Sequence, residues 1–241
     1  MVSYLREIVL KLVEVKKIYR VDGVETMALR GVDLEVYRGD FVAIMGPSGS
    51  GKTTLLNMMG LLDKPTSGKV YVDGVDVTML GDREMAEIRN KKIGFVFQQF
   101  NLVNRLSVLE NIELPLIPRR IPRKKRLEMV KSALLKVGGE LSWLNKKPTQ
   151  LSGGQQQRVA IARAIVGNPE IVLADEPTGN LDSASAKIIM ETFIELNKAG
   201  HTIIVVTHDP EIAACAEKVY LLRDGVIVGE LSLDKSKCKA Y

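Results

Sequence analysis

Residues 46–53 read GPSGSGKT and fit the phosphate-loop pattern G-x-x-x-x-G-K-[ST]. The apolar run FVAIM (41–45) precedes the loop and predicts a buried strand, and a helix is expected near 52–62. This order of strand, loop and helix is the context that a true phosphate loop requires. The stretch therefore predicts an α/β fold with a nucleotide-phosphate site at the end of this strand.

Each residue type in the loop suits a phosphate site. Gly46, Gly49 and Gly51 let the backbone curl so that successive N–H groups point inward, and the helix N-terminus adds its positive dipole end. Lys52 is expected to reach the β- and γ-phosphates, and the Thr53 hydroxyl to bind Mg²⁺. The predicted nucleotide contacts in the loop are Gly46, Ser48, Gly49, Ser50, Gly51, Lys52, Thr53 and Thr54.

Apolar, β-branched segments alternate with helical ones along the 241-residue chain, which is the pattern of an α/β fold with a mostly parallel sheet. We expect strands at 93–98, 171–175 and 202–208, a helix near 184–198, and hairpins at 69–77 and 218–230. Residues 99–168 differ from the rest because their pattern is helical: Leu127, Val130 and Leu134 share one helical face. The chain is therefore predicted to be one domain, in which 1–98 and 169–241 form the α/β core and 99–168 a helical subdomain.

The composition is that of an ordinary globular protein, with 46% hydrophobic and 26% charged residues. No apolar run reaches the ~18–20 residues of a membrane span. Charged residues interrupt residues 1–15, so neither a signal peptide nor a span is expected there. Cys215 and Cys238 predict no disulfide framework, in keeping with a reducing cytoplasm.

The net charge of +5 arises from one stretch, because RRIPRKKR (119–126) alone contributes six basic residues. A solvated loop, a surface for anionic lipid headgroups and a nucleic-acid contact are the alternatives for this stretch. No aromatic residues are interleaved with the charges, which disfavours nucleic acid.

The stretch IVLADEPT (171–178) leads a hydrophobic strand into two adjacent acids, Asp175 and Glu176. Because a strand alternates its faces, the two carboxylates cannot do the same work. Asp175 is expected to hold Mg²⁺, and Glu176 to polarise a water for attack on the γ-phosphate. A second acid directly after the metal-binding one favours hydrolysis over phosphoryl transfer to a metabolite.

These motifs, together with LSGGQ (151–155), make the chain resemble the ATP-binding-cassette (ABC) ATPases, over nearly its whole length. Gln98 matches the glutamine loop of that family, although Gln99 stands beside it and the assignment could shift by one residue. GNLD (179–182) matches its D-loop, with Asn180 in place of a commoner alanine, and His208 matches its switch histidine. Tyr19 falls where the family stacks an aromatic ring on adenine.

The resemblance implies a P-loop NTPase (RecA-like) core with an antiparallel β subdomain, and ATP with Mg²⁺ as cofactors. It implies a head-to-tail homodimer, in which each ATP lies between one chain's phosphate loop and the other chain's signature residues Ser152, Gly153, Gly154 and Gln155. Ser152 caps that helix, and the two glycines leave its first N–H groups bare. The implied catalytic residues are Glu176 as general base, Gln98 as sensor of Mg²⁺ and water, and His208 on the γ-phosphate. Thr53, Gln98 and Asp175 are the implied metal ligands, and Asp182 would signal across the dimer.

The amino-acid sequences of these motifs are similar to those of ATP subunits that serve lipoprotein-release and macrolide-efflux permeases. This branch implies a separate integral membrane permease, a location on the inner face of the cell membrane, no nucleic-acid partner and no membrane span in this chain. A cell-division-type ABC ATPase, which transmits force without transport, is the alternative.

The segment after Gln98 is unusually apolar for a loop. Phe100, Leu102, Val103, Leu106, Val108 and Leu109 fall within ten residues. Either all six fill the core of the helical subdomain, or some line a groove that receives a cytoplasmic helix of the permease.

Overall fold

The computed structural model describes residues 6–240. Part of the sequence expectation for residues 1–15 therefore lies outside the described residues. No helix within 6–240 is long and apolar enough to cross a membrane.

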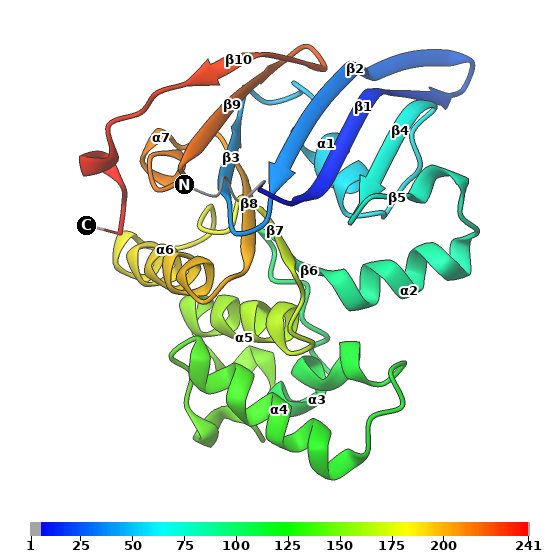
Figure 1. Ribbon diagram of the computed structural model, residues 1–241. Helices are drawn as coiled ribbons and strands as arrows, with labels where there is room; N and C mark the ends of the chain where they lie inside the picture. The colour runs from blue at the N-terminus through cyan, green and yellow to red at the C-terminus, as the bar shows by residue number, and fades with distance from the viewer. Residues whose placement is uncertain (1–5, 241) are drawn as a thin grey trace, which may run out of the picture.

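A six-stranded sheet with strand order β10-β9-β3-β8-β7-β6 forms the centre of the molecule (Figure 1). The neighbouring strands from β9 to β6 run parallel, and β10 is antiparallel to β9. Its strands are β3 (Phe41–Met45), β6 (Ile93–Val96), β7 (Ile171–Asp175), β8 (Thr202–Thr207), β9 (Lys218–Arg223) and β10 (Val226–Leu231). The expected mostly parallel α/β sheet is confirmed, as is the closing hairpin, which turns at Asp224 and Gly225.

The central strands are apolar along their middle, because both faces of the sheet are covered there. In β8, Ile204 and Val206 belong to the core on one face, whereas Ile203 and Val205 belong to the core on the other. Strands β3 and β7 alternate in the same way. The sheet thus separates two cores, and its edges and strand ends hold the polar residues.

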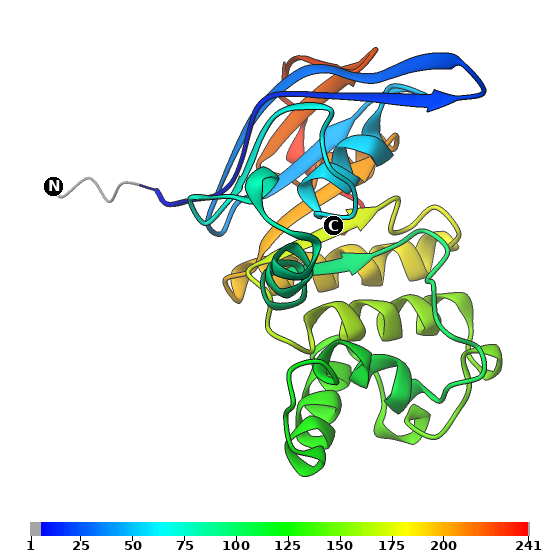
Figure 2. The same cartoon turned by 90° about the vertical axis from the view of Figure 1, so that its right-hand side faces the viewer.

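One face is covered by α1 (Lys52–Met59) and by a second, antiparallel sheet in the order β2-β1-β4-β5. Figure 2 shows this sheet at the top, away from the helical layer. Its strands are β1 (Ile8–Val21), β2 (Val24–Tyr37), β4 (Ser67–Val72) and β5 (Val75–Asp76). The β4–β5 hairpin turns at Asp73 and Gly74, whose φ angles are 47° and 74°, as the Asp-Gly pair predicts.

Helices cover the opposite face, with α5 and α6 against the sheet and α4 farther out (Figures 1 and 2). The helices of this layer are α3 (Val108–Glu113), α4 (Arg123–Lys136), α5 (Gly153–Ile165), α6 (Ser183–Lys198) and α7 (Pro210–Ala213). Helix α2 (Asp82–Lys92) lies beside β6, and its Ile88 packs against the core on the α1 face. Single 3₁₀ turns lie at Val77–Met79, Leu114–Leu116, Leu141–Trp143, Pro148–Gln150 and Lys235–Lys237. Val130 and Leu134 of α4 are fully buried, as the helical face predicts. The division into 1–98 with 169–241 and 99–168 stays a prediction.

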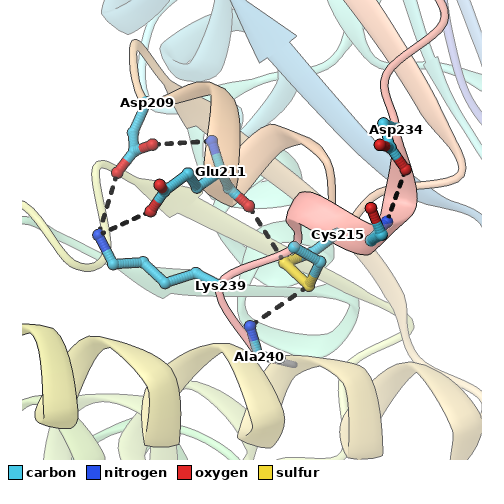
Figure 3. Close-up of a disulfide and its surroundings, with 8 residues drawn as sticks. Asp209, Glu211, Cys215, Asp234, Lys239 and Ala240 are labelled. Carbon is cyan, nitrogen blue, oxygen red and sulfur yellow. Dashed lines mark hydrogen bonds and ion pairs between the residues drawn. A yellow bond between two sulfur atoms is a disulfide. The ribbon is translucent and has the colours of Figure 1, made fainter.

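Cys215 and Cys238 form a disulfide (Figure 3). The expectation that the two cysteines would stay unpaired is therefore wrong. The fold returns the C-terminal segment to the end of α7, which brings the two Cα atoms to 4.6 Å, within the range that a disulfide bridges.

Candidate nucleotide-binding site

The phosphate loop adopts a conformation that its glycines permit. Gly49 and Gly51 have φ angles of 80° and 100°, in the left-handed region that favours glycine, and Gly51 directly precedes α1. At Gly46 the requirement is space, because a Cβ there would lie 2.2 Å from the carbonyl oxygen of Leu222. Each of the three glycines therefore has a structural reason at its position.

The ammonium group of Lys52 is held inside this loop. Its Nζ donates hydrogen bonds to the carbonyl oxygens of Gly46, at 2.7 Å, and Pro47, at 2.9 Å. Phosphate oxygens are acceptors of the same kind with more charge, so they can replace these carbonyls as partners of Lys52. Ser48, Gly49 and Thr53 are exposed, Thr54 is half-buried, and Ser50 is buried with no partner for its hydroxyl among the described residues.

Asp175 and Thr53 meet at the carboxyl end of β7. Thr53 Oγ1 lies 3.5 Å from Asp175 Oδ2, although the residues are far apart in sequence. Burial, and next the charge of Glu176, raise the pKa of Asp175, and the Thr53 hydroxyl and the charge of Lys52 offset this rise only in part. One carboxylate beside one hydroxyl is the protein share of a Mg²⁺ site that is completed by phosphates and water. The residues present therefore fit the predicted ion.

Glu176 follows β7 directly and has a φ of 44°, which is rare for a side-chain-bearing residue. Its carboxylate accepts hydrogen bonds from the Thr207 hydroxyl, at 3.1 Å, and from the backbone N–H of His208, at 3.1 Å. The imidazole Nδ1 of His208 lies 2.7 Å from the same carboxylate. The structure thus brings together the two residues that the sequence predicts as general base and γ-phosphate contact.

Gln98 lies just beyond β6 and touches the D-loop. A Cβ at Gly179 would come within 2.8 Å of the Gln98 side-chain amide, and Asn180 Nδ2 donates to the Gln98 carbonyl oxygen at 2.9 Å. These contacts favour Gln98 over Gln99 as the glutamine-loop residue. They also show what the side chain of Asn180 does: it donates a hydrogen bond that the alanine of the commoner motif could not make.

The signature residues begin α5. Ser152 and Gln155 cap each other: Ser152 Oγ accepts from the Gln155 N–H, and Gln155 Oε1 accepts from the Ser152 N–H. The N–H groups of Gly153 and Gly154 are left without a hydrogen-bond acceptor, because the first turn of a helix offers none within the helix. Gly154 also has no room for a side chain, because a Cβ would lie 2.8 Å from Ser185 Oγ of α6.

The three successive glutamines each have a different backbone or capping partner. Gln155 closes the cap, Gln156 Nε2 donates to the Leu151 carbonyl oxygen, and the fully buried Gln157 donates to that of Pro177. Gln157 therefore connects α5 to the segment that follows the two acids. This role was not predicted from the sequence.

Arg163 was also missed by the sequence analysis. From the last turn of α5 its guanidinium donates to the carbonyl oxygens of Phe100, at 2.8 Å, and Asn101, at 2.6 Å. Both residues have positive φ angles, 58° and 49°, so the backbone just after Gln98 is held in a costly conformation. Burial lowers the pKa of Arg163, as expected for a cation whose two bonds go to neutral carbonyls.

Tyr19 and Asp182 have local partners in this structure. The Tyr19 hydroxyl donates to Asp63, at 3.2 Å, and the Lys17 ammonium lies 5.0 Å from the ring centroid, so an adenine would stack on the other face of the ring. Asp182 caps α6 by accepting from the N–H and hydroxyl of Ser185, and these bonds lower its pKa.

The carboxyl ends of parallel strands β3, β7 and β8 thus gather the phosphate loop, Asp175, Glu176 and His208 at one edge of the sheet. The signature residues belong to the helical layer on the other face (Figure 1). Within residues 6–240, no hydrogen bond joins the loop 46–53 to residues 151–155.

A groove of about 1050 Å³ runs between α2, β6, α5 and residues 114–120. Phe95, Phe97, Leu114 and Pro115 give it an apolar lining, which also includes Asn101 and Arg163. None of the six apolar residues of 100–109 lines it. Val108 is buried in the core beneath the sheet, and Leu102 and Leu109 pack against that core. These three residues therefore pack in the core, the first of the two alternatives, and do not line a groove.

Two of the six basic residues of 119–126 are structural. Arg119 donates to the carbonyl oxygen of Gly167, at 2.8 Å, and to Asn90 Oδ1, at 2.9 Å. Arg126 pairs with Glu113, at 2.5 Å. Arg123, Lys124 and Lys125 are exposed, and the interpretations of this stretch stay predictions for them.

A family model described as ABC transporter matches residues 29–179. An uncharacterized ABC transporter ATP-binding protein of Thermotoga maritima is 51% identical over 92% of this chain and 94% of its own length. The macrolide export ATP-binding/permease protein MacB of Syntrophobacter fumaroxidans is 50% identical over 92% of this chain, which spans 31% of that protein.

Among solved structures, the chain is similar to the ATP-binding cassette MJ0796 of Methanocaldococcus jannaschii, described as a dimer in a post-hydrolysis state bound to ADP and Pi. The TM-score is 0.87 at 48% identity, covering 93% of this chain and 99% of the other.

Proposed function

The chain belongs to the ABC transporter family and is an ATP-binding ATPase; from this premise we propose that two copies hydrolyse MgATP together to drive a membrane permease of the lipoprotein-release or macrolide-efflux type. The relatives of matching length support a permease on a separate chain, and the MacB relatives, whose name joins ATP binding to a permease, support its type. Such a subunit would sit on the inner face of the membrane through its permease. None of the relatives named above supports the cell-division alternative.

The observation that carries the proposal is the position of the signature helix. The free N–H groups of Gly153 and Gly154 lie at the start of α5, in the helical layer, and make no hydrogen bond to this chain's own phosphate loop. A helix N-terminus with bare N–H groups suits a phosphate, so the phosphate must come from elsewhere. A head-to-tail dimer would supply it as the partner's ATP, and the related cassette is described as dimeric.

Within each site the residues of this chain have distinct tasks. Lys52 binds the β- and γ-phosphates, while Thr53 and Asp175 hold Mg²⁺, with Gln98 beside it. When bound, the ion would neutralise negative charge that develops on the phosphates. Glu176 orients the attacking water and takes its proton at the carboxylate, and His208, on that carboxylate in this structure, contacts the γ-phosphate. Tyr19 would stack on the adenine.

A complementation experiment tests the shared site. Chains carrying Ser152→Arg, which fills the signature side, are mixed with chains carrying Lys52→Ala, which removes the phosphate charge. Each variant alone should be inactive, whereas the mixed heterodimer has one intact site and should regain up to about a quarter of wild-type activity, since half the dimers are mixed and each has one of two sites. No gain on mixing, with both variants folded by circular dichroism, would exclude the shared site.

The groove between α2 and residues 114–120 is the proposed docking site for a cytoplasmic helix of the permease. Its lining has six basic side chains and one acidic, Glu87. Arg89, Arg119 and Arg163 donate to carbonyl oxygens, and within residues 6–240 no carboxylate pairs with them. The side chains of Lys91 and Arg120 have no partner among the described residues. An apolar floor with a positive rim fits an amphipathic helix that carries acidic residues.

Charge reversal tests this docking. Lys91→Glu with Arg120→Glu should lose co-purification with the permease and any stimulation by it, while nucleotide binding by the isolated subunit is retained. Lys125→Glu with Lys131→Glu, on the outer face of α4, is the matched control and should bind the permease normally. Normal binding by the groove variant would place the docking site elsewhere without affecting the shared-site proposal.

A further inference from the structure

The C-terminal segment 232–240, which we name the strap, is fastened to α7 by a covalent bond. Cys238 of the strap is disulfide-bonded to Cys215, two residues beyond the end of α7. Cys238 and Ala240 are buried and belong to the core beneath the sheet. Figure 3 shows the strap between α7 and the underlying helix α6. The disulfide thus closes a covalent loop that contains β9 and β10.

The strap also contacts the start of α7, directly after the predicted switch histidine. Lys239 Nζ lies 3.4 Å from Asp209 Oδ2 and 3.6 Å from Glu211 Oε2, and the Lys239 N–H donates to the Glu211 carbonyl oxygen at 3.1 Å. Asp209 in turn caps α7 through the Glu211 N–H. Because Asp209 follows His208 in the chain, the strap helps to hold the backbone that positions His208 on Glu176.

We infer that Cys215 and Cys238 form a reversible thiol–disulfide site, whose oxidised state holds the strap on α7 and thereby keeps the His208 segment in place for ATP hydrolysis. Neither residue belongs to any motif of the phosphate site. The reactant is a dithiol–disulfide couple, of the small-molecule or protein class, because exchange with such a couple needs no other oxidant.

The chemistry of the exchange follows from the burial of the two sulfurs. Cys238 is 3% exposed and Cys215 is half-buried, so an incoming thiolate reaches Sγ of Cys215. Its attack forms a mixed disulfide, breaks the Cys215–Cys238 bond and releases Cys238 as a thiolate. The second thiol of the reductant then attacks the mixed disulfide, releases Cys215 as a thiolate and leaves as a cyclic disulfide. Two electrons pass to the protein, and both thiolates take protons from water.

Thiol counting and activity together test the inference on the full-length wild-type chain. Purified without reductant, the chain should show no iodoacetamide-reactive thiol after denaturation, and two after treatment with dithiothreitol. Reduction should lower the melting temperature by about 5–10 °C, as loss of a loop-closing cross-link predicts. It should also lower the ATPase rate by about 2–5-fold, because the strap's hydrogen bonds to α7 are weakened. Oxidised dithiothreitol should restore both values.

Matched variants separate the disulfide from general reductant effects. Cys215→Ser and Cys238→Ser should behave like the reduced wild type and ignore dithiothreitol. Lys239→Ala should keep the disulfide by thiol counting but lose part of the ATPase rate. Two free thiols in the unreduced protein would overturn the inference, and so would a reduced wild type with unchanged ATPase activity, because the strap would then not act on the His208 segment.

Discussion

The Nδ1 atom of His208 lies 2.7 Å from Oε1 of Glu176, and the backbone N–H of His208 donates to the same oxygen. Thr207 holds the other carboxylate oxygen. The last residue of β8 and the residue after it therefore hold the carboxylate that directly follows the neighbouring strand β7. A movement of residues 207–208 would therefore shift Glu176, so this contact joins the proposed γ-phosphate contact to the proposed general base.

Glu176→Gln should lower the ATPase rate by about 10²–10⁴-fold, the range that removal of a general base produces. ATP binding should persist, because the amide still accepts a hydrogen bond from the His208 N–H and the phosphate loop is untouched. Since the closed dimer is no longer consumed by hydrolysis, size-exclusion chromatography with MgATP should show a stable dimer. A variant that stays monomeric at high concentration would contradict the role of Glu176. Glu191→Gln, at an exposed position of α6 away from the carboxylate pair, is the control.

Asn180→Ala should lower kcat by about 3–10-fold without weakening ATP binding, because one hydrogen bond worth about 1 kcal/mol positions the glutamine loop. The bond runs from Asn180 Nδ2 to the carbonyl oxygen of Gln98. Asn180→Asp keeps the size of the side chain but has no donor, so it should match the alanine variant. If the aspartate variant retains the wild-type rate in steady-state assays, the hydrogen bond has no catalytic role.

Arg163→Met should raise the Mg²⁺ concentration needed for half-maximal ATPase activity, because the backbone after Gln98 loses both donors that hold Phe100 and Asn101. It should also lower the melting temperature by several degrees, about 2–4 °C per kcal/mol for a chain of this size. Arg158→Met is the matched control, since Arg158 lies on the same helix but bonds the Gly138 carbonyl oxygen. The control should lose stability and keep its Mg²⁺ dependence; an equal shift in both variants would refute a role for Arg163 at Gln98.

The core strands could be predicted from sequence because burial on both faces makes them continuous apolar runs. The hairpin of β1 and β2 was not recognised, since register shifts between Ile8 and Leu10, Leu12 and Val15, and again near Lys16 and Lys17, break the period-two alternation. Helix α2 was missed for a related reason. Met85 is its one buried side chain, so its sequence has no apolar stripe of helical period.

Motifs identified most of the candidate site, but contacts between motifs required the fold. Asn180 and Gln98 are 82 residues apart, and a one-dimensional pattern shows Asn180 only as a departure from the commoner motif. The spacing of Cys215 and Cys238 likewise carries no information about their distance in space. Arg163 looked like an ordinary polar position in a helix, and its partners are backbone atoms, which leave no trace in the sequence.

The raised pKa of Asp175 has a consequence for stability. In the unfolded chain an aspartate titrates near pH ~3.9, and burial together with Glu176 moves the folded value upward. Folding therefore favours the protonated form, so this group contributes stability below the unfolded pKa and loses it as the pH rises through the folded pKa. At neutral pH the ionised Asp175 destabilises the nucleotide-free protein, and a bound Mg²⁺ would compensate its charge.

Asp175→Asn should consequently raise the melting temperature of the nucleotide-free protein at pH 7.5, because the amide has the same shape and carries no buried charge. The gain should shrink as the pH falls and vanish below about pH 4, where the wild-type carboxylate is protonated in both states. With MgATP the order should reverse, since the wild type gains stability by binding and the variant, lacking the metal ligand, gains less. Scanning calorimetry at several pH values, with and without MgATP, measures all three effects.

Asp76→Asn is the control, because hydrogen bonds from Thr78 lower the pKa of Asp76, so its neutralisation should lower the melting temperature at pH 7.5. A nucleotide-free Asp175→Asn protein that melts below the wild type at pH 7.5 would mean that the carboxylate is already compensated without the ion.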